Sequence, residues 1–459
     1  MNFAFYDLET TGTSPAFDQP LQFAAILTDG EFREIERVNL RCRIAPHIIP
    51  SPWALAVTGV RPAQLVDPAL PTLLEFTQEI GVLIERWSPA IWTGFNSIRF
   101  DEEMLRQAFY QNLQPDIFAT QFNGNTRFDV LTALYAVWQR QPDLFEWPVD
   151  PDGRVRFKLD RIAPLNGFAS HNAHDALGDV EATIHIARQI AQRAPGLWAE
   201  LLANRDKAHV QASLATFQPM ALVERFGGGL PRATVGCFCG TSASNPNQAA
   251  FFDLDAADPT DLLTADDAAV FAAVDATPKV IRAFSINKSP ALLPVAAPSA
   301  EQLRRAAVIA DAHEFRTRVG NALAARFPED LAASAPPVEK QIFGGFYSHA
   351  DKALLAEFQR MDWARRQEIV ATLADLRLRQ LGRRLVAFHA PELLSTEERE
   401  QYQAWLRERW SAPDVPETEW TTLDRARSAL DEMRSDGGID PGLVPEIAVY
   451  LQGFDPAHG

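Results

Sequence analysis

Phe3-Ala4-Phe5-Tyr6-Asp7-Leu8-Glu9-Thr10-Thr11-Gly12 places two carboxylates at the end of an apolar run. The residues before Asp7 are apolar and aromatic, which predicts a buried central strand that ends in a turn at Thr10–Gly12. Because side chains alternate across a strand, Asp7 and Glu9 lie on the same face. Two acids on one face favour a divalent-cation site with oxygen ligands. The alternative is a strand end that carries charge only for solubility.

The length and composition of the chain predict a multidomain globular protein. With 459 residues about three domains are expected, and a hydrophobic content of 47% allows a large core. Three cysteines cannot form a disulfide framework, and Cys237-Phe238-Cys239 lacks the second pair of ligands that a zinc site needs. A reducing, cytoplasmic location is therefore expected.

The charge of the chain bears on its partners. A net charge of −17 argues against nucleic acid at first sight. Screening limits each charge to about 8 Å at physiological salt, so a local basic groove can still bind DNA on an acidic protein. The N-terminus has no secretory signal pattern, and no apolar run is long enough to span a bilayer, so no membrane association is expected.

The pattern of elements predicts three regions. Residues 1–195 form an α/β unit with a mixed sheet, in which three successive strands precede alternating helix and strand. Residues 196–338 begin with a helical connector and continue as a small β-rich domain with Gly- and Pro-rich turns. Residues 339–459 are wholly helical, with apolar residues at period-3.6 spacing. The expected elements are strands 3–7, 21–28, 32–43, 90–93, 220–223, 234–238, 249–254 and 280–286, helices 71–87, 101–111, 128–139, 174–191, 195–208, 300–327, 350–363, 366–381, 396–410 and 421–433, a loop at 142–157, a linker at 291–298 and a flexible hairpin at 226–230.

Three further residues join Asp7 and Glu9 as candidates for chemistry. Asp101 follows a Gly/Asn turn at a helix start, where a helix N-cap is the alternative role. His174 and Asp179 belong to a segment in which Ser170 or Asn172 could cap a helix, with Asp179 in its second turn. A lone histidine is usually a surface or core residue, but one that precedes a helix presenting an acid is a candidate for catalysis.

Four acids and one histidine from three segments suit a two-metal phosphodiester hydrolase. Two cations about 3.5–4 Å apart can hold the attacking and leaving oxygens. The ligands must be hard oxygens, and a histidine with a reference pKa near 6.5 can accept a proton from the attacking water. Gly-x-Ser-x-Gly is absent, and no Ser-His-Asp arrangement has comparable support.

The three motifs, in order, resemble the DEDDh 3′–5′ exonucleases. They are Asp-x-Glu-Thr-x-Gly, Asn-x-x-x-Phe-Asp and His-x-x-x-x-Asp. Within that superfamily the chain is similar to the exonuclease I family over nearly its whole length. Segments 7–16, 22–26, 96–103, 170–183, 204–207, 286–290 and 345–348 carry that similarity.

The resemblance implies a fold and a set of roles. It implies a ribonuclease H-like exonuclease domain at 1–195, an SH3-like domain at 196–338 and a helical domain at 339–459. Asp7, Glu9 and Asp179 would bind one catalytic metal, Asp7 would bridge to a second, Asp101 would act through water, and His174 would be the general base. The cofactor would be two Mg²⁺ ions, with Mn²⁺ as a substitute. Lys158 lies in Phe157-Lys158-Leu159, where the family usually has arginine, so phosphate contact is expected without a bidentate fork.

The expected activity is a 3′–5′ exonuclease that degrades single-stranded DNA to 5′-mononucleotides. Arg205, Lys207 and Lys288 are expected to contact the strand. For Arg377, Arg379, Arg383 and Arg384, a solvated helix face is favoured over a groove lining. The resemblance further implies binding to the acidic C-terminal tail of single-stranded DNA-binding protein, and a monomer is expected. The alternatives are an RNA-directed DEDDh enzyme and a non-catalytic single-stranded-DNA-binding module.

Overall fold

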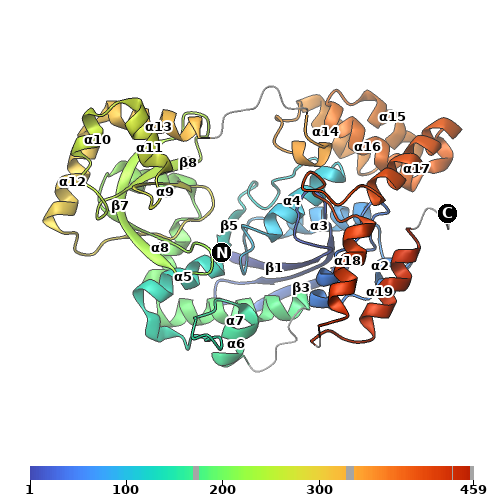
Figure 1. The fold of residues 1–459 in the computed structure, drawn as a ribbon, viewed down its shortest axis with the longest axis horizontal. Coiled ribbons are helices and arrows are strands. Elements are labelled where there is room, and N and C mark those ends of the chain that lie inside the picture. The colour runs from blue at the N-terminus through green and yellow to red at the C-terminus, as the bar shows by residue number, and fades with distance from the viewer. Residues whose placement is uncertain (169–174, 327–334, 437, 455–459) are drawn as a thin grey trace.

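The computed structural model describes residues 1–168, 175–326, 335–436 and 438–454 (Figure 1). A central sheet near the N-terminus carries helices on both faces, a second sheet lies to one side of it, and the C-terminal helices lie to the other. No helix among the described residues is long and apolar enough to cross a bilayer.

The first sheet is mixed, as the sequence predicts. Its five strands lie in the order β3-β2-β1-β4-β5, so β1 is central. β1 pairs antiparallel with β2 and parallel with β4, and β4 pairs parallel with β5. The strands are β1 Asn2–Thr10, β2 Pro20–Thr28, β3 Glu34–Arg41, β4 Ala90–Gly94 and β5 Thr126–Asp129.

Alternation along β1 decides which helices each side chain meets. Phe3 and Phe5 pack into the core on the face covered by α5 and α7. Ala4, Tyr6 and Leu8 pack into the core on the opposite face, with α3 and α4. Asp7 and Glu9 continue the first series, so they lie on the α7 face.

The helices of this part of the chain are α1 Pro52–Thr58, α2 Pro62–Leu65, α3 Leu73–Trp87, α4 Asp101–Gln111, α5 Val130–Arg140, η1 Pro142–Leu144, α6 Leu159–Leu165, α7 Ala176–Arg193, α8 Pro195–Ala203 and α9 Lys207–Ala215.

The second sheet is antiparallel, with five strands in the order β10-β6-β7-β8-β9. Helices α11 and α13 pack on it, and Cys237 and Cys239 lie unpaired in that core. The elements are β6 Met220–Glu224, β7 Arg232–Thr241, β8 Gln248–Asp253, α10 Thr260–Thr264, α11 Asp267–Asp275, β9 Ile281–Ser285, β10 Leu292–Pro294, α12 Ala300–Asp311 and α13 His313–Ala325. A small β-rich unit is confirmed, and its SH3-like character stays a prediction.

The C-terminal helices pack back onto the first part of the chain. Leu423 and Leu430 share a core with Leu55, and Leu74 shares another with Leu381. The elements are η2 Val338–Gln341, α14 His349–Phe358, α15 Trp363–Thr372, α16 Leu376–His389, η3 Pro391–Leu393, α17 Thr396–Trp410, α18 Leu423–Met433 and α19 Leu443–Gln452. The helical region therefore shares apolar cores with helices α1 and α3.

Several sequence-based element predictions are wrong in detail. The segment taken as a helix from residue 128 begins as the short strand β5, and α5 follows only at Val130. The helix predicted for 300–327 is divided between α12 and α13 at Ala312, and the predicted linker at 291–298 contains β10. Helix α7 begins at Ala176, so Asp179 lies in its first turn and not its second.

Candidate active site

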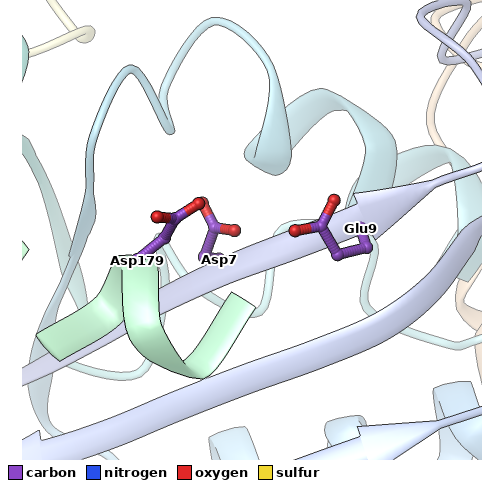
Figure 2. A group of neighbouring side chains, drawn as sticks. All are labelled: Asp7, Glu9 and Asp179. Carbon is purple, nitrogen blue, oxygen red and sulfur yellow. The ribbon is translucent and has the colours of Figure 1, made fainter. Parts of the chain in front are cut away.

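Three carboxylates converge where β1 meets α7. One oxygen from each of Asp7, Glu9 and Asp179 lies within 4.8 Å of the others (Figure 2). Asp7 and Glu9 face α7 because they share the face of Phe3 and Phe5, and Asp179 faces them from the first turn of the helix. The pair predicted from the first stretch therefore gains the third acid from a segment about 170 residues away in sequence.

Asp101 joins this group from the other side of β1. It is 3% exposed, and its Oδ1 accepts a hydrogen bond of 3.0 Å from the Leu8 amide. Leu8 lies between Asp7 and Glu9 in β1, so this bond places the Asp101 carboxylate beside the backbone that carries both acids, and its charge adds to the burial that raises their pKa. The alternative role of Asp101 as a helix N-cap is not observed: Asp101 is the first residue of α4, and Phe100 holds the N-cap position without a side-chain cap.

Burial disfavours the charged form of all four acids when no cation is bound, and repulsion from other acids of the group adds to this for Asp7 and Glu9. Burial raises the pKa of Glu9 to about 8, of Asp101 to about 8 and of Asp179 to about 7. Burial, followed by repulsion from Asp101, Asp179 and Glu9, raises the pKa of Asp7 well above its usual value. Grouped carboxylates offset their desolvation and repulsion by binding a cation. Oxygen donors alone, as here, fit a hard divalent ion.

The stability of the metal-free protein is expected to fall as pH rises through this range. A raised native pKa means that the folded state holds protons that the unfolded state has released, so stability present below about pH 4 is lost by about pH 8. A divalent cation should reverse the loss, because it binds the deprotonated acids. Melting temperatures measured with chelator and with Mg²⁺ or Mn²⁺ should therefore diverge toward pH 8. An equal gain at pH 5 and pH 8 would contradict the arrangement.

His174 lies outside the described residues, as do Ser170 and Asn172. The residue that follows it, Asp175, holds the N-cap position of α7. The Asp175 carboxylate accepts a 2.8 Å hydrogen bond from Gln22 Nε2 and lies 3.4 Å from Arg41. Gln22 lies opposite Glu9 in the sheet, so the Asp175 side chain lies near the Glu9 end of the cluster, and its charge adds to the burial that raises the pKa of Glu9 and of Asp179.

Lys158 is exposed at the start of α6, which packs against α7. Its neighbour Phe157 is buried beneath a cation that sequence reasoning did not identify. The Arg225 guanidinium lies 5.3 Å from the centre of the Phe157 ring and 5.9 Å from that of Tyr135. Arg225 lies between β6 and β7, so the second sheet contributes a positive charge that packs on the residue preceding Lys158. The sequence feature that could have directed attention to Arg225 is the Gly-rich turn that begins two residues later, at Gly227.

Arg205 and Lys207 lie far from the carboxylates. They line a cavity of about 430 Å³ together with Arg127 and the exposed ring of Phe122. The Arg205 guanidinium contacts Met1 Sδ at 3.4 Å, which places the cavity at the N-terminal end of β1. Asp7 is six residues further along that strand, a span of about 20 Å at about 3.3 Å per residue.

Lys288 and three of the four arginines on α16 have protein partners. Lys288 Nζ lies 3.3 Å from Glu103 Oε1. The predicted solvated face is wrong for three of the four arginines on α16, which are partly buried, and Arg383 alone of the four is exposed. Arg377 pairs with Asp375, Arg379 bonds the Leu373 carbonyl and Arg384 pairs with Glu339, and none of these bonds lies at the carboxylates.

Comparison with known proteins agrees with this geometry. The family model described as Exonuclease matches residues 4–187, and the model described as Exonuclease I C-terminal domain matches residues 336–452. The Exodeoxyribonuclease I of Haemophilus influenzae is 28% identical over 475 residues, which cover 98% of this chain and 98% of that protein.

Solved structures extend the comparison to three dimensions. Exonuclease I of E. coli in complex with a dA16 oligonucleotide is 26% identical, with a TM-score of 0.82 over 99% of this chain and 100% of that one. A structure described as SSB/Exonuclease I in complex with inhibitor CFAM is 26% identical, with a TM-score of 0.81 over 99% of each chain. With its carboxylate site, its two matched regions and its full-length similarity, this chain belongs to the exonuclease I family.

Proposed function

We propose that the chain is a divalent-metal-dependent 3′–5′ exodeoxyribonuclease that releases 5′-mononucleotides from single-stranded DNA. The observation that carries the proposal is the convergence of Asp7, Glu9 and Asp179. Full-length similarity to exonuclease I bound to an oligonucleotide supports DNA as the substrate. Exonuclease domains depend on divalent metals, and Mg²⁺, with Mn²⁺ as a substitute, is the proposed ion.

Each acid has a proposed role at the scissile phosphate. Asp7, Glu9 and Asp179 would hold the first ion, Asp7 would share the second, and Asp101 would reach it through water. When bound, the ions supply positive charge for the attacking and leaving oxygens and lower the pKa of a bound water. The cluster excludes other anions until that charge is present, because its own carboxylates repel them.

Residues outside the four acids are proposed to accept the proton of the attacking water and to contact the DNA strand. His174 would accept the proton from the attacking water, and Lys158 would contact a phosphate near the 3′ end. Arg225, beside Phe157, would add a second positive charge there. Arg205 and Lys207 would contact the DNA strand several nucleotides from its 3′ end, in the cavity at the N-terminal end of β1. Lys288, which lies beside Glu103, would also contact the DNA strand.

Three further features complete the proposal. The single-stranded DNA-binding protein is the proposed partner, supported by the SSB/Exonuclease I structure, with its acidic C-terminal tail as the contacting segment. The boundaries 1–195, 196–338 and 339–459 are proposed as domain limits, and the protein is proposed to act as a monomer. A cytoplasmic location is supported by three buried cysteines without disulfides.

The direct test is the product ladder of labelled oligonucleotides. A 5′-labelled single strand should shorten one nucleotide at a time from its 3′ end, in the presence of Mg²⁺ and not of chelator. A blunt duplex of the same sequence should be degraded far more slowly, and a matched RNA strand should persist. Preferential loss of the RNA strand would instead identify the RNA-directed enzyme. Binding of DNA without any shortening would identify the non-catalytic module.

A further inference from the structure

Asp129 lies at the C-terminal end of β5 and is 3% exposed, although none of the proposed roles uses it. Its side chain caps α5 by accepting hydrogen bonds of 3.0 Å from the Leu131 amide and 3.3 Å from the Thr132 amide. Capping alone would explain an aspartate here. However, the same carboxylate also binds a segment outside its own helix.

That second segment is the loop between β4 and α4, which carries Asp101. Asp129 Oδ1 accepts from the Asn96 amide at 3.2 Å, and Oδ2 accepts from the Ile98 amide at 3.2 Å. β4 pairs with β5 through Gly94 and Asp129, so the loop leaves the sheet directly beside the carboxylate. A charged acceptor shared among four amides forms charge-assisted bonds, which fix a backbone more strongly than neutral ones.

The backbone of this loop adopts a strained conformation and begins in close contact with β1, so the hydrogen bonds from Asp129 are needed to hold it. Asn96 has φ of 66°, a left-handed conformation that is costly for a residue other than glycine. A Cβ at Gly94, the last residue of β4, would lie 2.6 Å from the Tyr6 carbonyl oxygen, so the chain is packed directly on β1 where the loop begins. Asp101 then meets the same strand through its bond to the Leu8 amide.

We propose that Asp129 is a positioning residue that holds the loop of residues 95–100 through the Asn96 and Ile98 amides and thereby sets Asp101 against the Asp7/Glu9 carboxylates. It acts through the backbone and does not touch metal or substrate. Second-layer contacts of this kind typically change metal affinity or rate by about 10- to 100-fold when they are removed. The inference rests on the proposed function for its kinetic readout, whereas metal binding tests it separately.

Two variants separate loop anchoring from helix capping. Asp129→Asn keeps the shape but places an amide donor against amide donors. Asp129→Ser keeps a good N-cap for α5 but has no second oxygen to reach Ile98. Both are expected to raise the half-saturating Mn²⁺ concentration by about 10-fold and to lower kcat by about 10- to 100-fold. KM for a single-stranded oligonucleotide should stay within about twofold, since strand contacts lie elsewhere.

Asp362→Asn is the matched control, because Asp362 caps α15 through the Arg365 amide at 2.9 Å, remote from the carboxylates in the C-terminal region. It should leave the Mn²⁺ dependence unchanged and the melting temperature nearly so, because asparagine is about as good an N-cap as aspartate. Mn²⁺ binding is measured by calorimetry on each folded variant, with melting temperatures alongside. If both Asp129 variants bind Mn²⁺ as the wild type does, the inference is overturned. An inactive wild type that binds Mn²⁺ normally would refute the proposed function and leave this comparison intact.

Discussion

Asp7→Asn is expected to reduce mononucleotide release from single-stranded DNA by about 10³-fold or more, the scale seen when a central catalytic group is removed. Asp7 faces Glu9 on the same strand and Asp179 on α7 within one cluster. Asparagine here would carry no charge and offer a single oxygen, so it would be a poor replacement for the carboxylate in holding the proposed cations. Initial rates on a 3′-labelled oligonucleotide at saturating Mg²⁺ measure the loss. A reduction of less than about tenfold would remove Asp7 from the metal centre.

The same substitution should stabilise the metal-free protein, in the opposite direction to its effect on activity. The Asp7 carboxylate destabilises the metal-free folded state, because burial and three neighbouring acids raise its pKa well above the usual value. Removing its charge relieves that repulsion, as is common where a functional site is strained. The melting temperature of the Asp7→Asn variant should therefore exceed that of the wild type in chelator at pH 8. Asp29→Asn is the control, because Asp29 is paired on the surface with Arg33 at 2.7 Å and should leave activity unchanged.

The sequence predicted the part of the site that local periodicity controls. A period of two is enough to place Asp7 and Glu9 on one face of β1, and the structure confirms which residues share that face. Periodicity could not say which face met which helix, because that depends on the packing of α5 and α7. Asp179 was identified from the order of the motifs. It was expected in the second turn of its helix but lies in the first, because α7 begins at Ala176.

Asp101 and Asp129 show where local rules fail. An aspartate at a helix start predicts a cap, yet Asp101 bonds to the Leu8 amide, 93 residues away in sequence. Asp129 does cap a helix, but it lies at the end of the four-residue strand Thr126–Asp129, whose last two residues were assigned to the apolar helix that follows. Short buried parallel strands carry no alternation, so propensity cannot separate them from a helix.

Long-range packing explains the remaining differences. Arg205 and Lys207 were expected to contact the DNA strand. Only the contact between Arg205 and Met1 places their cavity at the N-terminal end of β1, away from the carboxylates. The C-terminal helices were predicted as helices, but not their contact with the nuclease core through Leu423 and Leu55. Contacts between segments hundreds of residues apart leave no periodic signal in either segment.

His174→Ala is the second substitution with a large expected effect, a loss of about 10²- to 10⁴-fold in rate at neutral pH. The side chain of Asp175, the next residue, accepts a hydrogen bond from Gln22, which lies opposite Glu9 in the sheet, and its charge adds to the burial that raises the pKa of Glu9 and of Asp179. A base at this position removes a proton from water without binding metal. Mn²⁺ affinity and oligonucleotide binding should therefore persist.

The pH profile distinguishes a base at His174 from a structural residue. The wild-type rate should rise through a pKa near 6.5, the reference value for histidine, whereas the His174→Ala rate should lack that limb and recover in part as hydroxide increases. His185→Ala is the matched control on α7, because the His185 ring contacts the Asn166 carbonyl at 2.9 Å and should leave the profile unchanged. If His174→Ala keeps the wild-type rate and the wild-type profile at neutral pH, another group accepts the proton, and the catalytic role passes from this histidine to the carboxylates and their bound water.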